Sequence, residues 1–351
     1  MSKEIKIRVL VVDDSALMRK KISEMINADE HCEVIGTARD GEEAIRSVAT
    51  LRPDVVTLDL ELPRMDGITA LQYIMSEWPT PIIIVSAYRQ YRGMDVIQCL
   101  EYGAVDLVAK PSGVISRDVV SVKDELLGKI RSAAKVNLRV LRPYFAEGVE
   151  GGEKPKFSLA DKMVAIASST GGPRALMEIL PKLDANIPAG ILVLQHMPEG
   201  FTESMAQRMD GESKIRVREA KDGDCLREAE VLVARGGFQL TLDSAGKNGV
   251  NVQLSRGAKM HGVAPCADIT MKSLAPLFGK KCLGVVLTGM GWDGAEGLRA
   301  IKRFGGSTMA QDAATSVVYG MPKAAVDAGL ADKVLPLAQM AQAIMSWARA
   351  A

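Results

Sequence analysis

The chain has 351 residues and a formal net charge of +1 at pH 7, from 44 Lys and Arg against 43 Asp and Glu. Its length favours two domains over one, and the balanced charge argues against a nucleic-acid-binding role. Its five cysteines are scattered without a CxxC pair, which argues against a disulfide framework or a zinc site and favours reduced thiols in a cytosol.

Residues 1–126 alternate β-branched apolar runs with helical patterns. The strand-like runs are IRVLVV, CEVIGT, DVVTLDL, PIIIVS and AVDLVA, and helical patterns such as ALMRKKISEMI and GEEAIRSVATL lie between them. Strands that are apolar almost throughout and are separated by helices form parallel sheets with both faces covered. The alternation therefore predicts a first α/β domain with a five-stranded parallel sheet.

The stretch 127–160 begins with a basic helical pattern and becomes rich in Gly, Glu, Lys and Pro, so we predict an interdomain linker there. A second alternation fills residues 161–351. Its strand-like runs are MVAIAS, GILVLQ, EVLVA, NVQLS, CLGVVLT and GSTMAQ, with helical patterns at 173–181, 200–209, 270–278, 294–303 and 338–350. This half is predicted to be a three-layer α/β domain.

Polar residues end the strands of the first domain. They are Asp13 and Asp14, Asp59, Ser86 and Lys110. Ligands of an open parallel sheet bind outside the carboxyl ends of its strands, so these side chains are expected at one functional edge. Three carboxylates gathered there repel one another, and Mg²⁺, which takes oxygen ligands, would relieve the repulsion.

This set, with LPRMDG following the third strand, resembles the receiver domain of two-component response regulators, whose fold is flavodoxin-like. The resemblance implies that Asp59 accepts a phosphoryl group and that Asp13, Asp14 and Asp59 hold Mg²⁺. It also implies that Ser86 and Lys110 contact the phosphoryl oxygens.

The turn SSTGGPR follows the first strand of the second domain and leads into a helix. Such a turn suits either a phosphate or a nucleophilic serine. A P-loop would need a lysine followed by Ser or Thr after its last glycine, and none is present. A nucleophile needs a histidine and an orienting carboxylate. His196 and Asp293 each follow an apolar strand, whereas His261 lies in a polar loop where a surface histidine is expected. The spacing alone leaves Ser168 and Ser169 both open as the nucleophile.

The motifs SSTGG, LQHMPEGF, LTGMGWDGAEGL and AQDAATSVVYGMP resemble the catalytic domain of the chemotaxis protein-glutamate methylesterases, in which a receiver precedes an α/β serine hydrolase domain. The resemblance covers essentially the whole chain. It implies Ser169 as nucleophile, His196 as base and Asp293 as orienting acid. Thr170 and Met290 are candidates for supporting the site or its oxyanion hole.

The resemblance also implies the function. The expected reaction is hydrolysis of glutamyl methyl esters on chemoreceptors, releasing methanol, together with glutamine deamidation. A histidine kinase would supply the phosphoryl group, the esterase site would need no cofactor, and the receiver would restrain the hydrolase until it is phosphorylated. No signal-peptide pattern and no apolar run of membrane-spanning length occur, so we expect a cytoplasmic protein without membrane insertion.

Four positions depart from the family pattern. Leu107 stands where many receivers carry an aromatic residue, Arg235 where proline is common, Trp292 where asparagine is common, and Cys266 where serine is common. Three rival functions are a non-catalytic signalling module, a transcriptional regulator and a general esterase of another chemosensory-like pathway. The complete Ser, His and Asp set argues against the first, and the repeated βα units argue against the second.

Overall fold

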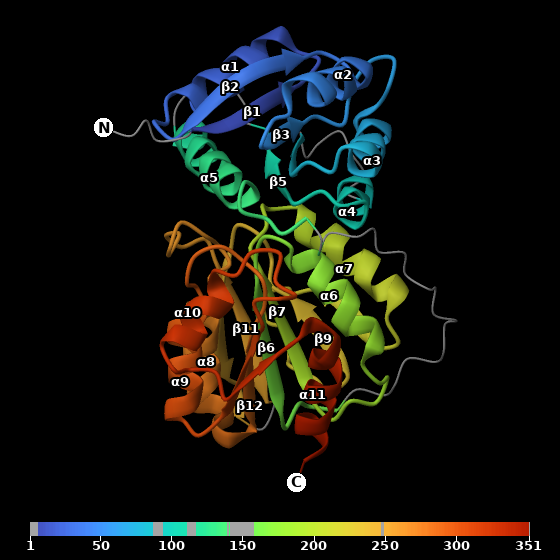
Figure 1. Ribbon diagram of the computed structural model, residues 1–351. Helices are drawn as coiled ribbons and strands as arrows, with labels where there is room; N and C mark the ends of the chain where they lie inside the picture. The colour runs from blue at the N-terminus through green and yellow to red at the C-terminus, as the bar shows by residue number, and fades with distance from the viewer. Residues whose placement is uncertain are drawn as a thin grey trace. The chain divides into compact units, whose positions relative to one another are not determined.

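The computed structural model describes residues 6–86, 94–110, 117–138, 140, 158–246 and 249–350, with the backbone alone for 94–96 and 117–121. The chain folds into two compact units, Met1–Tyr144 and Phe145–Ala351. Each unit has its own sheet with helices on both faces (Figure 1).

The first unit has the predicted flavodoxin-like fold. The strands in its described part are β1 (Ile7–Val12), β2 (Cys32–Ala38), β3 (Val55–Leu58), β4 (Ile82–Ser86) and β5 (Asp106–Ala109). They pair in parallel in the order β2-β1-β3-β4-β5. The strand order reverses between β1 and β3, which is where parallel α/β sheets bind their ligands. The acidic residues that follow these two strands therefore lie at the ligand-binding edge.

The helices of the first unit cover both faces of its sheet. They are α1 (Ala16–Asn27), α2 (Gly41–Leu51), α3 (Gly67–Glu77), α4 (Met94–Glu101) and α5 (Arg117–Ala133). Helices α1 and α5 pack together on one face, and α2 and α3 pack together on the other (Figure 1). Three of them begin at a side-chain cap, because Ser15, Asp40 and Asp66 each accept a hydrogen bond from a backbone amide of the first turn.

Helix α5 continues beyond residue 126, where the sequence predicted the end of the first domain. Its buried face includes Leu126 and Leu127 and continues through Ile130 and Ala133. The apolar contacts that hold α5 to the sheet therefore extend seven residues into the predicted linker. Residues 141–157 of that linker lie outside the described residues.

The second unit contains a larger parallel sheet. Its described strands are ordered β14 (Lys333–Leu335), β13 (Ser307–Gln311), β12 (Cys282–Val286), β6 (Met163–Ser168), β7 (Gly190–Gln195), β9 (Glu230–Val233) and β8 (Arg216–Glu219). Every residue of β6, β7 and β12 is buried, as expected for central strands covered on both faces. The short strands β8 and β14 lie at the two edges, and their partly exposed residues gave no apolar run from which to predict them.

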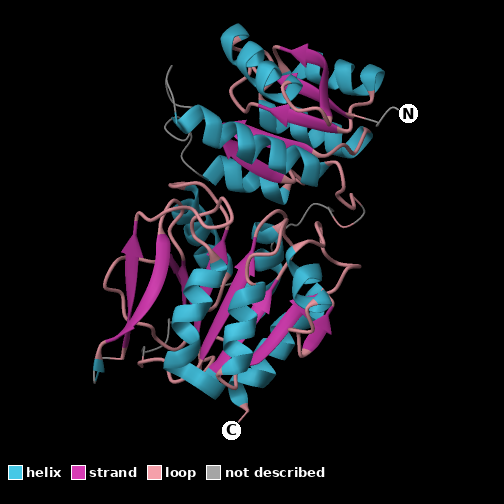
Figure 2. Cartoon of the chain, turned by 90° about the vertical axis from the view of Figure 1, so that its left-hand side faces the viewer, coloured by secondary structure: helices cyan, strands magenta, loops and turns pink. Residues whose placement is uncertain are grey.

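Helices form the outer layers of this unit (Figures 1 and 2). Helices α8 (Ala267–Phe278), α9 (Ala295–Arg303) and α10 (Met321–Asp327) lie on one face, and α6 (Gly172–Ile179), α7 (Phe201–Glu212) and α11 (Leu337–Arg349) lie on the other. Among the described residues, no helix is both long and apolar enough to cross a membrane.

The run NVQLS does not join the parallel sheet. It forms β11 (Val250–Ser255), which pairs antiparallel with β10 (Gln239–Ser244) in a separate hairpin. The hairpin packs on α8 through β10, beyond the edge of the main sheet (Figure 2). Both strands contain exposed or partly exposed residues and are not buried throughout, as expected for a pair that is partly open to the solvent.

A glycine lets α3 approach the end of β3, and its substitution should destabilise the first unit. A Cβ at Gly67 would lie 2.2 Å from the carbonyl oxygen of Asp59 and 2.6 Å from Cα of Leu60. Because these are backbone atoms, we expect Gly67→Ala to lower the free energy of unfolding by about 1–3 kcal/mol. The measurement is thermal and urea unfolding of the full chain.

The matched control is Gly128→Ala in α5, where an added Cβ meets nothing within 4 Å. Alanine is the better helix former, so this variant should be at least as stable as the parent. Equal unfolding midpoints for the two variants would contradict the packing argument.

Candidate active site

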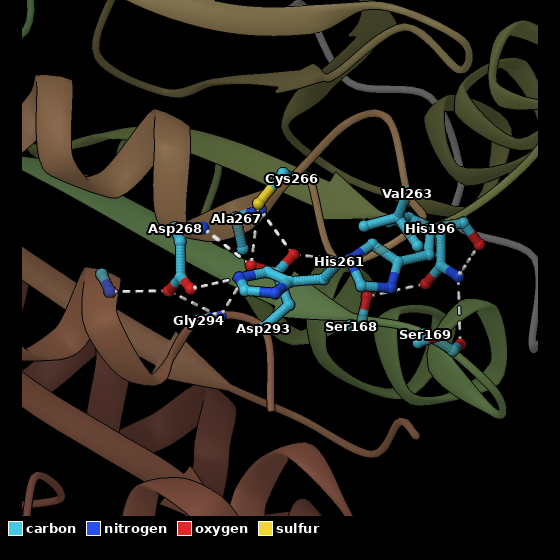
Figure 3. Close-up of polar contacts among 12 residues, drawn as sticks. Ser168, Ser169, His196, His261, Val263, Cys266, Ala267, Asp268, Asp293 and Gly294 are labelled. Carbon is cyan, nitrogen blue, oxygen red and sulfur yellow. Dashed lines mark hydrogen bonds and ion pairs between the residues drawn. The ribbon is translucent and has the colours of Figure 1, made fainter. Parts of the chain in front are cut away.

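Three strand-end loops of the second unit bring Ser169, His196 and Asp293 to one edge of the sheet. Ser169 directly follows β6, His196 directly follows β7, and Asp293 lies in the loop between β12 and α9. The strands are neighbours in the order β12-β6-β7, so the serine loop lies between the other two. The sheet topology thus gathers the residues that the sequence predicted to act together (Figure 3).

His196 and Asp293 form a direct pair. Nε2 of the imidazole lies 2.7 Å from Oδ2 of the carboxylate. Asp293 is 2% exposed, and burial alone would raise its pKa. The hydrogen bond and charge of His196 outweigh that effect, together with bonds from Asp268 and Cys266, so the pKa of Asp293 is well below its usual range. The carboxylate is therefore ionised whenever the protein is folded near neutral pH.

The carboxylate oxygens of Asp293 also accept hydrogen bonds from three backbone amides and one thiol. Its oxygens accept hydrogen bonds from the backbone amides of Ala267 at 2.7 Å, Asp268 at 2.9 Å and Gly294 at 3.0 Å, and from the Cys266 thiol at 3.0 Å. These bonds fix the orientation of the carboxylate, and the carboxylate in turn holds the imidazole.

The two serines of the turn have different surroundings. Ser168 is fully buried, and its hydroxyl donates to Oε1 of Gln195 at 2.7 Å. Ser169 is half-buried, and its hydroxyl makes no hydrogen bond to any described residue, His196 included. The hydroxyl of Ser168 is thus committed to the interior, whereas that of Ser169 is available to a substrate. Nucleophile and base commonly come within hydrogen-bond distance only when a substrate binds.

The two candidates for supporting the site come from two segments next to Ser169, the turn that contains the serine and the loop that follows β12. Thr170 is 2% exposed, and its carbonyl accepts a hydrogen bond from the Thr288 hydroxyl. Met290 is 43% exposed and follows Gly289, which packs directly on the serine. A Cβ at Gly289 would lie 2.8 Å from the Cβ of Ser169. The loop that carries Met290 is therefore held beside the proposed nucleophile by this close approach.

The first unit brings the predicted phosphorylation residues together as well. Nζ of Lys110 lies 2.5 Å from Oδ2 of Asp59 and 2.8 Å from Oδ2 of Asp13, so the lysine bridges the two buried carboxylates. Burial raises the pKa of Asp59 to about 6, and the nearby charge of Asp13 adds to the increase, although the hydrogen bond from Lys110 opposes it. Ser86 is also buried, and its hydroxyl has no hydrogen-bond partner among the described residues.

The acidic cluster fits a hard divalent cation. Asp13, Asp14 and Asp59 each offer a carboxylate oxygen, and these oxygens lie within 4.8 Å of one another. Asp14 is exposed, so one side of the cluster is open to solvent. Oxygen ligands from one or two carboxylates, completed by water and phosphate, are what Mg²⁺ prefers.

Comparisons with known proteins agree with this geometry. The sequence profile of CheB methylesterases matches residues 164–344, and that of response regulator receiver domains matches residues 9–116. A protein-glutamate methylesterase/protein-glutamine glutaminase of Pyrococcus abyssi is 49% identical over 97% of this chain and 93% of its own length. The chain belongs to the CheB methylesterase family. A relative of the same description from Symbiobacterium thermophilum is 45% identical over 96% of each chain.

A solved structure supports the same conclusion. The CheB methylesterase catalytic domain of Thermotoga maritima is 43% identical, with a TM-score of 0.52, and covers 53% of this chain and 97% of that domain. The family and both α/β folds predicted from the sequence are thereby confirmed, and the chain is a hydrolase with a response-regulator receiver. The roles of individual residues stay predictions.

The departures from the CheB methylesterase pattern lie in defined surroundings. Leu107 is buried in β5. Arg235 stacks on the ring of Phe238 and pairs with Glu199. Trp292 is 59% exposed, and Cys266 is fully buried against Asp293.

His261 and Asp268 lie beside the site and contact each other, which the sequence did not predict. Nε2 of His261 lies 3.1 Å from Oδ2 of the fully buried Asp268, and the imidazole meets the Trp292 ring edge to face. His261 is an exposed residue, as predicted, but it lies beside Asp293 rather than on a remote surface. Asp268 accepts bonds from the amides of Gly294 and Gly297, which ties the start of α8 to the start of α9. The only sequence signal is an acidic residue two positions before the helical pattern predicted at 270–278.

The cysteines should differ sharply in reactivity. Four are buried: Cys32, Cys99, Cys266 and Cys282. Burial and the charge of Asp293 raise the pKa of Cys266 to about 12, and only Cys225 is partly accessible. Because thiolates are the reactive form, a disulfide reagent at pH 8 should label one thiol quickly in the native chain and all five after denaturation. Mass spectrometry of the labelled chain identifies the sites. The control Cys225→Ser should lose the fast phase, and fast labelling of Cys266 in that variant would contradict the expectation.

Proposed function

We propose that this chain hydrolyses γ-glutamyl methyl esters of chemoreceptors and that Ser169, His196 and Asp293 carry out the reaction. The observation that carries this proposal is the 2.7 Å contact between His196 and Asp293 at the strand edge beside Ser169. Family membership supports the reaction class, since relatives that are 49% and 45% identical over nearly the whole chain are described as protein-glutamate methylesterases/protein-glutamine glutaminases.

The contact between Nε2 of His196 and Asp293 supports different roles for the two ring nitrogens. Nε2 is occupied by Asp293, so Nδ1 is the nitrogen that accepts the serine proton. Oγ of Ser169 attacks the ester carbonyl as Nδ1 takes its proton, and the departing methanol leaves with that proton. Water then attacks the acyl-serine with the same base, which releases a glutamate side chain and restores the serine. Asp293, ionised throughout, stabilises the charged imidazole.

The developing oxyanion needs donors beside Ser169. The turn after Ser169 leads into α6, and the first amides of a helix lack partners within the helix; the loop carrying Met290 packs against the serine through Gly289. We assign the oxyanion hole to backbone amides of these two segments, with Thr170 and Met290 as the candidates. One such donor is commonly worth about 10² to 10³-fold in rate. The same site would deamidate a glutamine, with ammonia leaving in place of methanol.

Regulation follows from the receiver. A histidine kinase transfers a phosphoryl group to Asp59, and the reaction is supported by Ser86, whose buried hydroxyl lacks a described partner, and by Lys110, which already contacts Asp59. Mg²⁺ held by Asp13, Asp14 and Asp59 would neutralise charge on the incoming phosphoryl group. Phosphorylation increases hydrolysis by relieving a restraint that the receiver imposes.

The nucleophile assignment is tested by a pair of serine variants. Ser169→Ala should reduce methanol release from methylated receptor by at least about 10⁴-fold, since the covalent route is lost. Ser168→Ala should keep the covalent route and lose stability by about 1–3 kcal/mol, because Oε1 of Gln195 loses its buried donor. A serine-reactive fluorophosphonate should label the parent and Ser168→Ala but not Ser169→Ala. Labelling of Ser169→Ala with loss in Ser168→Ala would reverse the assignment.

The phosphorylation site is tested by Asp59→Asn. This variant should keep the basal rate of methanol release and lose stimulation by a small phosphodonor in the presence of Mg²⁺. The matched control is Asp66→Asn, because Asp66 caps α3 through its bond to Thr69, and asparagine caps helices equally well. It should respond to the phosphodonor as the parent does. Equal stimulation of Asp59→Asn and the parent would exclude Asp59 as the acceptor.

A further inference from the structure

We propose that His261, Cys266 and Asp293 form a binding site for Zn²⁺ and that occupation of this site inhibits the hydrolase. Each residue offers one ligand atom, and the three atoms lie within 4.8 Å of one another. The inhibitory half of the proposal rests on the proposed function of Asp293, whereas the metal site itself does not. Figure 3 shows the three side chains gathered beside His196.

The donor set is suited to zinc. An imidazole nitrogen, a thiolate and a carboxylate oxygen are the three side-chain ligand types that Zn²⁺ takes, and three protein ligands with water in the fourth position is a common arrangement. Cys266 and Asp293 are buried, whereas His261 is exposed, so the cluster is accessible from the side of the histidine. A thiolate ligand favours Zn²⁺ over Mg²⁺ or Ca²⁺, which prefer oxygen ligands.

The donor atoms of Cys266 and Asp293 require only a small adjustment. Ligand distances of about 2.0–2.3 Å in a tetrahedral site place the donor atoms roughly 3.3–3.8 Å apart. Sγ of Cys266 and Oδ1 of Asp293 are now 3.0 Å apart, with the thiol proton between them. Zinc would take the place of that proton, which passes to solvent, and the two atoms would separate by roughly half an ångström. His261 closes the site by approaching from the exposed side.

The surroundings already orient the ligands. Metal-bound histidines commonly donate their other nitrogen to a carboxylate, and Nε2 of His261 lies 3.1 Å from the buried carboxylate of Asp268. This contact leaves Nδ1 for a metal. Asp293 is fixed by the amides of Ala267 and Asp268. A site whose ligands are already held in place loses less entropy on binding.

The backbone presents His261 in an uncommon conformation. Met260 and Val263 pair across a two-residue turn, and both central residues have positive φ, +54° for His261 and +80° for Gly262. Only a few per cent of residues other than glycine adopt such a φ. This turn places the imidazole next to a cysteine five positions later. The absence of a CxxC pair argued against zinc, but these ligands are brought together by the loop and by the end of β12.

Zinc would inhibit through Asp293. The carboxylate that holds and stabilises His196 would transfer charge to the metal, so the imidazole would lose the partner that makes it an effective base. The inhibition should be reversible on removal of the metal, because no covalent bond is made to the protein.

The test measures inhibition and metal binding separately on the full chain. Methanol release without a phosphodonor is followed as Zn²⁺ is titrated, with Mg²⁺ held in excess, and each variant is normalised to its own zinc-free rate. Cys266→Ser and His261→Asn should need at least about ten-fold more Zn²⁺ for half inhibition. Asparagine is chosen because it accepts positive φ. Serine is chosen because its hydroxyl can still donate to Asp293.

Binding is read from Cd²⁺ in place of Zn²⁺. The ultraviolet charge-transfer band of a cadmium thiolate reports ligation by cysteine and is insensitive to the acidic cluster of the receiver, which contains no thiol. The band should appear in the parent and in the control Cys225→Ser, and it should be lost in Cys266→Ser. The control variant should also be inhibited at the zinc concentration that inhibits the parent.

The outcomes separate the two halves. Without a Cys266-dependent cadmium band, the metal site is excluded, whatever the rate of hydrolysis. A band accompanied by hydrolysis that zinc does not slow, or slows equally in all variants, overturns the inhibition. A parent that binds cadmium at Cys266 but never releases methanol would contradict the proposed function and leave the site standing.

Discussion

The hydrolase site depends on one desolvated carboxylate. Asp293 is buried and ionised, which is costly unless donors replace the lost water. The amides of Ala267 and Asp268 come from the first turn of α8, and that of Gly294 immediately precedes α9, so two helix starts converge on it. Such starts carry unpaired amides and a partial positive charge. The carboxylate therefore fixes both helices against the sheet, and its Oδ2 also holds the imidazole of His196.

The two units each contain a buried aspartate in a segment that follows a strand, and the two carboxylates have opposite pKa shifts. Asp293 is saturated with hydrogen-bond donors, and its pKa is lowered, as an orienting group that must stay charged requires. Asp59 is buried with Asp13 close by, and its pKa is raised to about 6. Lys110 contacts the carboxylate of Asp59. The cluster of carboxylate oxygens to which Asp59 belongs is open to solvent on one side. The environment, more than the residue type, sets the pKa of each carboxylate and suits the two aspartates to the different roles proposed for them.

Much of this arrangement follows from the sequence, because parallel strands place their carboxyl ends at one edge. A serine of the SSTGG turn, His196 and Asp293 were predicted to meet on that basis. The choice between the two serines was not predictable from spacing. Adjacent residues at a strand end point to opposite sides, but only the fold shows that Ser168 faces Gln195. The β10–β11 hairpin and the contact of His261 with Asp268 could not be predicted from the sequence either. Both depend on turns whose conformation leaves no periodic signal in the chain.

Cys266 illustrates how one substitution can change two properties to very different extents. Where the family commonly has serine, this chain has a thiol that donates to Oδ1 of Asp293 at 3.0 Å. A hydroxyl would donate to the same atom, so the orientation of the carboxylate is served by either residue. A thiol differs from a hydroxyl far more as a metal ligand than as a hydrogen-bond donor. Selection for hydrolysis would therefore tolerate the exchange, and the metal affinity of the cluster would be free to vary among relatives with the same catalytic geometry.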